Sequence, residues 1–214
     1  MQCPLDSKPR WERRKDARPH ELLAAAIDLF VERGFAATRL EDVARRAGVS
    51  KGTLYLYYTN KEELFKAVVR ESILPFLGKA ELSVAEFEGH SAELLRSVVM
   101  NWSRQIGQSK ASGIGKLMLA EAVNFPELAR FYREEVMSRT RRMISSILER
   151  GIRRGEFRSF DTVQMTQVLI APMMMLNAWK HSAVAPCASD ELQPQAFLES
   201  LLDVTLHGLL PRAS

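Results

Sequence analysis

The stretch from Leu40 to Lys61, LEDVARRAGVSKGTLYLYYTNK, constrains the fold more than any other part of the chain. Small and apolar residues recur at helical spacing as far as Gly48, and Ser50 opens a second short helical pattern. Glycine adopts a positive φ at little cost, so Gly48 suits a tight turn between two helices. A serine N-cap accepts a hydrogen bond from a free amide of the first turn. The segment therefore predicts a helix-turn-helix.

The two helices are expected to pack through Val43, Ala44, Ala47 and Leu54, which leaves the other positions facing outward. The first turn of the second helix is the part of this motif that reaches base edges in the major groove of DNA. Lysine and threonine there can bond to bases, and an exposed apolar side chain can contact a thymine methyl group. We expect DNA contacts from Thr38, Arg39, Ser50, Lys51, Gly52, Thr53, Tyr55, Leu56, Tyr57 and Lys61.

These ten residues have different expected roles. Thr38 is placed to cap the helix that begins near Leu40. Tyr57 and Lys61 are placed for contacts with backbone phosphates, which fix the register on DNA without distinguishing sequences. The sequence therefore predicts one group of residues that select bases and another that holds the backbone.

Composition places the chain among soluble globular proteins. Of its 214 residues, 46% are hydrophobic and 26% are charged, both ordinary values. No apolar run approaches the roughly 20 residues that cross a bilayer, and the charged N-terminus lacks the apolar core of a signal peptide. Cys3 and Cys187 lie far apart, so we expect no disulfide framework and a cytoplasmic location.

Positive charge is concentrated near the helix-turn-helix. Residues 1–70 carry 14 Lys and Arg against 10 Asp and Glu, whereas residues 71–214 carry 16 of each. A DNA-binding surface gains affinity from such an excess because its cations release condensed counterions. A chance difference between two solvated surfaces accounts for it equally well.

Residues 1–18 are expected to form a disordered basic arm. The segment is polar, contains Pro4 and Pro9, and carries a group of cations that comprises Arg10, Arg13, Arg14, Lys15 and Arg18. Basic arms of this kind sometimes enter the minor groove beside a major-groove reader, but more often they are mobile termini.

Helical periodicity extends along nearly the whole chain, without a convincing alternating strand pattern. The first helix is expected from about His20 to Arg33, and a fourth from Asn60 or Lys61 until Pro75 ends or kinks it. A loop is expected around residues 78–89. Five more helices are expected near residues 91–108, 113–123, 126–153, 161–180 and 190–209. The predicted fold is all-α with about nine helices: a helix-turn-helix domain at residues 19–67 and a helical bundle for ligand binding and dimerisation at residues 68–214.

The pattern T-x-L-x-D-V-A-x-x-A-G-V-S-K-G-T-L-Y-x-Y-Y-x-x-K-E-E-L-F, from Thr38 to Phe65, resembles the DNA-binding domain of TetR-type regulators. The preceding run A-x-x-L-F-x-x-x-G-F-x-x-T, which begins at Ala26, extends the resemblance. One departure is Arg39, where the family often has threonine or serine, and the arginine is expected to add a phosphate contact. The run A-E-A-x-x-F-P-E-L-A-x-F-Y, from Ala120 to Tyr132, resembles one subgroup of the family.

The resemblance implies a homodimer that binds a palindromic operator in duplex DNA. It also implies a repressor that is released when an unknown small-molecule effector enters a pocket in a C-terminal helical domain. The usual architecture of such proteins is nine or ten helices.

Methionine and aromatic side chains make the C-terminal part a candidate for that pocket, because methionine adapts to irregular ligand shapes. The same residues at helical spacing also suit an ordinary core. The candidates for lining the pocket are Trp102, Met118, Glu121, Phe125, Met174 and Trp179. Glu121 lies in an almost wholly apolar helix, and a buried carboxylate needs a partner. That partner is either a cationic ligand or an arginine, with Arg104, Arg130 and Arg133 as candidates.

The last two helices carry more apolar surface than a thin domain buries, which favours an isologous four-helix interface over intrachain packing alone. The residues expected in this dimer interface are Val168, Met175, Leu198, Leu201, Leu202 and Thr205.

Other classes of protein fit the sequence less well. No metalloprotease, P-loop, dinucleotide or nucleophile-elbow motif is present, and His20, His90, His181 and His207 are scattered. We therefore expect no enzyme activity, no catalytic residue, no metal and no cofactor. A transcriptional activator and a sequence-tolerant DNA-binding protein without an effector remain alternatives. The latter would not need about 145 residues of neutral helical domain.

Overall fold

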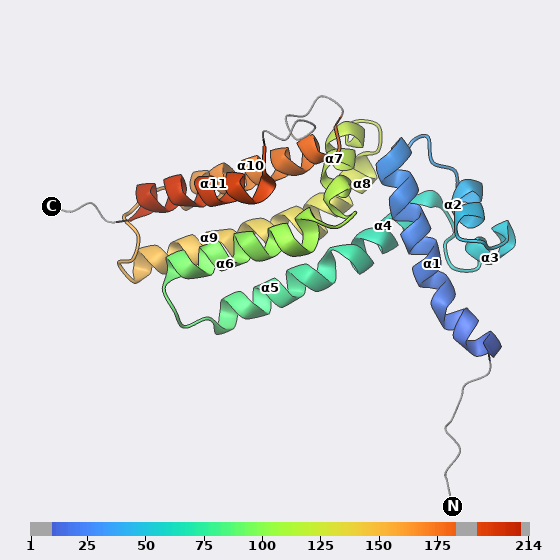
Figure 1. Ribbon diagram of the computed structural model, residues 1–214, viewed down its shortest axis with the longest axis horizontal. Coiled ribbons are helices and arrows are strands. Elements are labelled where there is room, and N and C mark those ends of the chain that lie inside the picture. The colour runs from blue at the N-terminus through green and yellow to red at the C-terminus, as the bar shows by residue number, and fades with distance from the viewer. Residues whose placement is uncertain (1–9, 183–191, 211–214) are drawn as a thin grey trace, which may run out of the picture. The chain divides into compact units, whose positions relative to one another are not determined.

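The computed structural model describes residues 10–182 and 192–210, with side chains from Pro19 onward, and Figure 1 shows its helices. The chain divides into two compact units, residues 1–68 and 69–214. Every regular element among the described residues is helical, which confirms the all-α class.

The N-terminal unit contains α1 (Arg10–Arg33), α2 (Leu40–Arg46), α3 (Lys51–Tyr55) and the first part of α4 (Lys61–Ser72). The C-terminal unit contains the rest of α4, then α5 (Leu74–Glu86), α6 (Ser91–Trp102), the π-helical turn η1 (Ser103–Gly107), α7 (Ser112–Glu121), α8 (Pro126–Tyr132), the π-helical turn η2 (Arg133–Met137), α9 (Ser138–Arg153), α10 (Thr162–Lys180) and α11 (Pro194–Leu209).

Three phenylalanine rings form the centre of the N-terminal unit. Phe30, Phe35 and Phe65 are almost fully buried, and their ring centroids lie 5.5–5.7 Å apart. Tilted and edge-to-face pairs at this spacing add to the free energy of burying the rings. Val43 and Leu54 are completely buried as predicted, so α2 and α3 are joined by their apolar faces.

Two predicted boundaries were wrong. The first helix begins at Arg10 rather than near His20, so residues 10–18 of the expected disordered arm continue α1. Residues 1–9 of that arm lie outside the described residues. The expected loop near residues 78–89 is mostly helix α5, because Pro75 stands in the first turn of a new helix. The missing amide of proline costs nothing there, whereas inside a helix it would remove a hydrogen bond.

The core of the C-terminal unit is built where α9 packs against α5, α6 and α10, and where α11 covers α6 (Figure 1). Leu95, Ile147, Leu169 and Leu198 are completely buried there. Full burial of one such side chain contributes about 1.5–3 kcal/mol relative to exposure, so this core stabilises the unit strongly.

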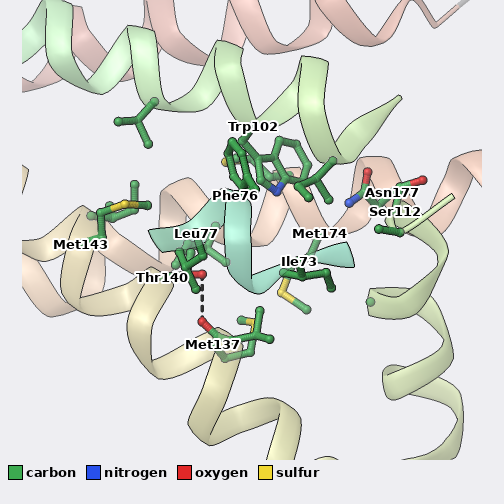
Figure 2. Close-up of a pocket in the computed structure, with 18 of the residues that line it drawn as sticks. Ile73, Phe76, Leu77, Trp102, Ser112, Met137, Thr140, Met143, Met174 and Asn177 are labelled. Carbon is green, nitrogen blue, oxygen red and sulfur yellow. Dashed lines mark hydrogen bonds between the residues drawn. The ribbon is translucent and has the colours of Figure 1, made fainter. Parts of the chain in front are cut away.

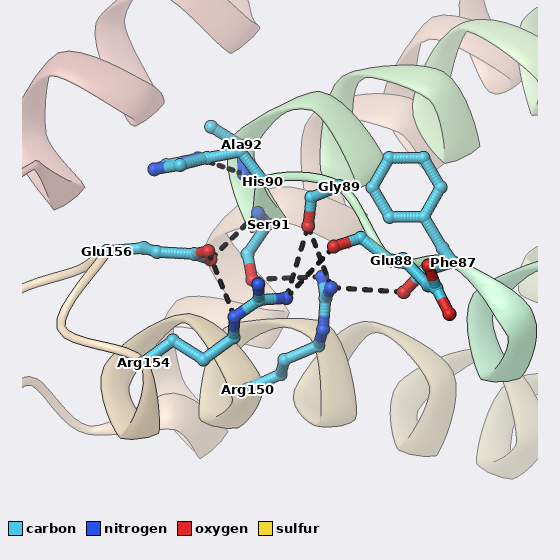
Figure 3. Close-up of polar contacts among 9 residues, drawn as sticks. All are labelled: Phe87, Glu88, Gly89, His90, Ser91, Ala92, Arg150, Arg154 and Glu156. Atoms are coloured by element: carbon cyan, nitrogen blue, oxygen red, sulfur yellow. Dashed lines mark hydrogen bonds and ion pairs between the residues drawn. The ribbon is translucent and has the colours of Figure 1, made fainter.

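A polar network closes one end of this unit, at the turn between α5 and α6 (Figure 3). The guanidinium of Arg150 donates to the carbonyls of Phe87 and Gly89 at 3.0 and 2.7 Å. The carboxylate of Glu156 accepts from the amide of Ser91 at 2.8 Å and lies 3.2 Å from Arg154. These contacts satisfy the free backbone groups of the turn and of the start of α6.

Replacing Glu156 with glutamine should destabilise the protein by about 1–2 kcal/mol at neutral pH, because a charge-assisted bond to the Ser91 amide is weakened. Burial raises the pKa of the Glu156 carboxyl, but hydrogen bonding from Ser91 and the charges of His90 and Arg154 outweigh it and lower the pKa overall. A group with a lowered folded pKa stabilises the protein above its unfolded pKa, about 4.3 for glutamate, and this contribution is lost as pH falls through the folded value.

Urea denaturation of wild type and Glu156→Gln should therefore differ at pH 7 and converge in acid, below the ordinary glutamate pKa. A difference that stays constant across this range would contradict the assigned role of the carboxylate.

Candidate DNA interface and ligand cavity

The predicted N-cap of α3 is confirmed. The hydroxyl oxygen of Ser50 accepts from the amide of Thr53 at 3.1 Å, and the two hydroxyl groups lie 2.8 Å apart. Leu54 is buried beneath the helix, while Tyr55 and Leu56 are 43% and 83% exposed. A large side chain that is exposed on so short a helix has no role in the core, so this face of α3 is available to a partner.

Lys51 is held by an acidic neighbour that the sequence did not single out. Its ammonium forms an ion pair with Glu41 of α2 and lies 5.7 Å from the ring centre of Tyr55. The hydrogen bond to Glu41 raises the pKa of Lys51, and the same bond lowers the pKa of Glu41. Exposed pairs of this kind contribute little free energy, so a DNA phosphate or base can displace the carboxylate.

Two glycines of the helix-turn-helix differ in what the fold requires of them. Gly48 has a φ of +67° in the turn between α2 and α3, as predicted. Gly52 lies on the exposed first turn of α3, and a Cβ built there would meet only the Ser50 hydroxyl, at 3.8 Å. Within the protein itself, a larger residue therefore fits at Gly52.

The prediction for Thr38 was wrong. Its side chain is 1% exposed, and its hydroxyl donates to the carbonyls of Leu29 and Gly34 at 3.1 and 2.7 Å. The N-cap of α2 is instead Arg39, whose side chain makes no capping hydrogen bond. Thr38 ties the end of α1 to the following loop and presents no hydroxyl to DNA.

The expected phosphate contact of Lys61 is also contradicted by the structure. Its ammonium donates to the carbonyls of Phe35, Ala36 and Thr38 at 2.7, 3.1 and 3.0 Å. It also lies 4.5 Å from the ring centre of Phe35. Lys61 thus fixes the loop between α1 and α2 onto the start of α4, and its donors are directed into the protein.

Replacing Lys61 with methionine should therefore lower the free energy of unfolding by about 2–3 kcal/mol, because three charge-assisted hydrogen bonds are lost. Water at the exposed carbonyl of Ala36 offsets only part of this loss. The salt dependence of DNA binding by the folded variant should not change, because no phosphate contact is removed. Urea denaturation and binding titrations at several salt concentrations measure the two effects. Unchanged stability together with a reduced salt slope would restore the original assignment.

The other expected DNA contacts stay predictions. Arg39 is exposed beside α2, and Tyr57 is half-buried, with its ring centre 6.5 Å from that of Tyr58. These two residues and Ser50, Lys51 and Thr53 all lie in the stretch of chain that begins before α2 and ends just after α3.

The C-terminal unit contains an apolar cavity of about 90 Å³ (Figure 2). Side chains from α5, α6, α7, α9 and α10 surround it, and its wall is dominated by aliphatic, aromatic and methionine groups. Tyr132 adds a phenol, and burial raises the pKa of that phenol to about 12, so it is neutral. Labelled members of the wall in Figure 2 are Ile73, Phe76, Leu77, Trp102, Ser112, Met137, Thr140, Met143, Met174 and Asn177.

Two of the six predicted pocket residues, Trp102 and Met174, line this cavity. The other four lie elsewhere. Met118 is buried in the core, and Phe125 precedes α8. The ring of Trp179 packs edge-on against that of Phe197, with centroids 6.3 Å apart.

Glu121 is the fourth residue placed outside the cavity. It is the last residue of α7 and is half-buried rather than enclosed in an apolar helix. The expected place of Glu121 in the wall of this cavity is therefore wrong, and the identity of its partner stays a prediction.

The dimer prediction requires a similar correction. Leu198, Leu202 and Thr205 are buried in the core of their own subunit and are closed to a partner. Val168 and Met175 on α10 are 53% and 47% exposed, and Leu201 on α11 is half-buried. Val204, one turn beyond Leu201, is 73% exposed. We call Val168, Ala171, Met175, Leu201 and Val204 the exposed α10–α11 face.

In the described part of the chain, no group of three or more His, Cys, Asp or Glu side chains is arranged to hold a metal ion. None of the helices described combines the length and hydrophobicity that a membrane span requires.

Comparisons with known proteins agree with this arrangement. The family model described as "Bacterial regulatory proteins, tetR family" matches residues 22–68. The model described as "Tetracyclin repressor-like, C-terminal domain" matches residues 88–205, more than half of the chain.

Individual proteins give the same result. The uncharacterised HTH-type transcriptional regulator YdeS of Bacillus subtilis is 31% identical over 159 residues, 74% of this chain and 77% of that protein. The HTH-type transcriptional repressor KstR2 of Rhodococcus jostii is 30% identical over 152 residues, 71% of this chain and 73% of the repressor.

A crystal structure of the transcriptional regulator FadR from Bacillus subtilis, in complex with stearoyl-CoA, has a similar fold. Its TM-score is 0.73 at 22% identity, and the match covers 89% of this chain and 98% of FadR. Both family models, the relatives at 30% identity or more and the helix-turn-helix geometry therefore lead to one assignment: the chain belongs to the TetR family of bacterial regulatory proteins.

Proposed function

We propose that this TetR-family protein is a transcriptional repressor that binds a palindromic operator as a homodimer and is released by a small-molecule effector. The observation that carries the DNA-binding part is the surface of α3, where a serine-capped first turn presents Lys51 and Thr53 beside the exposed Tyr55. KstR2 of Rhodococcus jostii is named a repressor, which favours repression over activation. Relatives named as regulators favour a protein without catalytic activity.

The cavity supports the effector part of the proposal. FadR was crystallised with stearoyl-CoA, and this chain, which has a similar fold, encloses an apolar space in its own C-terminal unit. A ligand can act only if it binds the DNA-free conformation more tightly than the DNA-bound one.

Helix α4 offers a route between the two functions because it is continuous across the division between the units, which falls after Val68. The residue that follows it, Ile73, lines the cavity. A ligand that displaces Ile73 is expected to move α4 and so change the spacing of the two α3 helices in a dimer. Small changes suffice, because that spacing must match the helical repeat of DNA.

The DNA-binding part is tested by selecting bound duplexes from a random-sequence pool and measuring fluorescence anisotropy on the selected and scrambled duplexes. Thr53→Ala should weaken binding to the selected duplex by about 1–3 kcal/mol, the usual cost of one base contact, and leave the scrambled duplex unaffected. Equal losses on both duplexes would remove Thr53 from base recognition.

A gain of affinity provides the complementary test. Glu41→Gln should strengthen binding severalfold, since it removes a negative charge from the interface and frees Lys51, which Glu41 otherwise pairs. Glu63→Gln, which removes a carboxylate paired with Lys66 on α4, is the matched control.

If no sequence is enriched from the random-sequence pool although the protein binds DNA, the protein is a sequence-tolerant binder and the proposal fails.

A further inference from the structure

A second pocket adjoins the apolar cavity and shares two of its residues. This pocket has a volume of about 350 Å³ and is lined by Trp102 and Asn177, which also line the apolar cavity. We call it the basic pocket, because its wall includes the cations Arg104 and Lys180. Figure 2 shows Asn177 and Ser112 close together, to one side of Trp102. The junction therefore lies at the polar end of the apolar cavity.

The apolar cavity offers few free polar groups to a ligand. The hydroxyl of Thr140 donates to the carbonyl of Val136 at 2.9 Å. The hydroxyl of Ser112 is 2.7 Å from both the carbonyl of Ser109 and the Nε2 of His181. Since these groups already have protein partners, a charged ligand atom placed here would lose its hydration without compensation. The cavity suits a hydrocarbon body, and a chain longer than its volume of about 90 Å³ holds must displace wall side chains such as Ile73.

The basic pocket has the opposite character. Arg104 and Lys180 are exposed, and no aspartate or glutamate stands among the residues that form its wall in the described structure. The ammonium of Lys180 donates to the carbonyl of Gly107 at 2.6 Å, which holds it at the rim and leaves two further donors. The two cations approach from η1 and the end of α10, so they favour an anion between them.

Resting on the proposed function, we propose that the effector is an amphipathic anion, with an apolar body in the cavity and an anionic head group in the basic pocket. Asn177 lies at the junction, where its amide can donate to the first polar atom of the head group. Trp102 lines both the apolar cavity and the basic pocket, so it offers apolar surface to the ligand in each of them. A carboxylate and the phosphates of an acyl thioester of coenzyme A share this chemistry.

The test compares ligands that have one hydrocarbon chain and different head groups, by calorimetry on the full-length protein without DNA. Decanoate or decanoyl-coenzyme A should bind at least about tenfold more tightly than decanol, as expected for charge-assisted hydrogen bonds, and decyltrimethylammonium should bind least. Tighter binding of the thioester than of decanoate would identify phosphate as the head group, and the reverse would identify carboxylate.

The variant Arg104→Gln/Lys180→Gln should remove the preference for the anion and leave the affinity for decanol unchanged. Both side chains are exposed, so the variant should fold normally. Lys79→Gln/Arg153→Gln, which removes two exposed cations that line neither pocket, is the control and should keep the preference. Equal affinity for decanol and both anions, or a preference that survives in the first variant, would overturn the inference.

Failure of this inference can be distinguished from failure of the proposed function. If an anionic amphiphile binds as described without weakening operator binding, the head-group assignment stands and ligand-controlled release fails. If a neutral or cationic ligand releases the operator, release stands and the head-group assignment fails.

Discussion

Replacing Gly52 with glutamate is expected to reduce operator affinity to the level of non-specific DNA, a loss of about 1000-fold or more. Gly52 lies in the exposed first turn of α3, beside the residues placed to contact bases. A glutamate there puts both bulk and negative charge between the helix and the duplex. The measurement is fluorescence anisotropy with the selected operator, alongside urea denaturation of the same variant.

Gly52→Ala separates the DNA effect from folding. A Cβ at this position meets no atom of the protein closer than 3.8 Å, so alanine is accommodated without strain. Alanine also favours helix by about 0.5–1 kcal/mol over glycine, so the variant should be slightly more stable while it binds operator more weakly. If both Gly52 variants bind like wild type, α3 does not approach DNA with this turn, and the proposed interface is wrong.

Val204→Asp is expected to give the second largest effect, because it places a charge on the most exposed large apolar side chain of the exposed α10–α11 face. In an interface with two-fold symmetry the same patch is used by both subunits, so each aspartate enters a desolvated contact near its symmetry mate. Loss of the dimer removes the avidity of two linked half-sites, which lowers operator affinity by about 100-fold or more. Sedimentation velocity measures the assembly state and anisotropy measures the affinity.

The matched control for this variant is Val123→Asp. Val123 is 90% exposed between α7 and α8 and belongs to neither α10 nor α11, so the same substitution should leave both dimer and operator binding intact. Because Val204 is 73% exposed in the single chain, Val204→Asp should fold as a monomer. A Val204→Asp protein that remains dimeric would place the interface on another surface.

Local sequence signals were enough to predict the helix-turn-helix. The Ser50 cap, the turn at Gly48 and the burial of Val43 and Leu54 each depend on residues within a few positions of one another. The roles of Thr38 and Lys61 were missed for the opposite reason. Thr38 bonds to a carbonyl nine residues away, and Lys61 bonds to carbonyls 23 to 26 residues away. From the sequence alone, a lysine near a DNA-binding helix suggests a phosphate contact. Only the folded position of the loop between α1 and α2 shows that Lys61 bonds to that loop instead.

The ligand cavity was harder to predict, for a related reason. Helical periodicity shows that a residue such as Met118 faces the interior, but it does not show whether the interior at that point is filled. Ile73, Phe76 and Leu77 were missed because Pro75 was interpreted as the end of a helix rather than the start of α5. Leu198 and Leu202 were assigned to the dimer because the amount of apolar surface buried within one chain depends on tertiary packing.

Control of DNA binding in the N-terminal unit by a ligand in the C-terminal unit can be measured through thermodynamic reciprocity. The affinity of the protein for its selected operator is measured with and without saturating decanoate or decanoyl-coenzyme A, whichever binds more tightly. The affinity for that ligand is then measured with and without operator. The ligand should weaken operator binding, and the operator should weaken ligand binding, by the same factor of about 5- to 150-fold. Equal affinity of the ligand for the free and the operator-bound protein would contradict it.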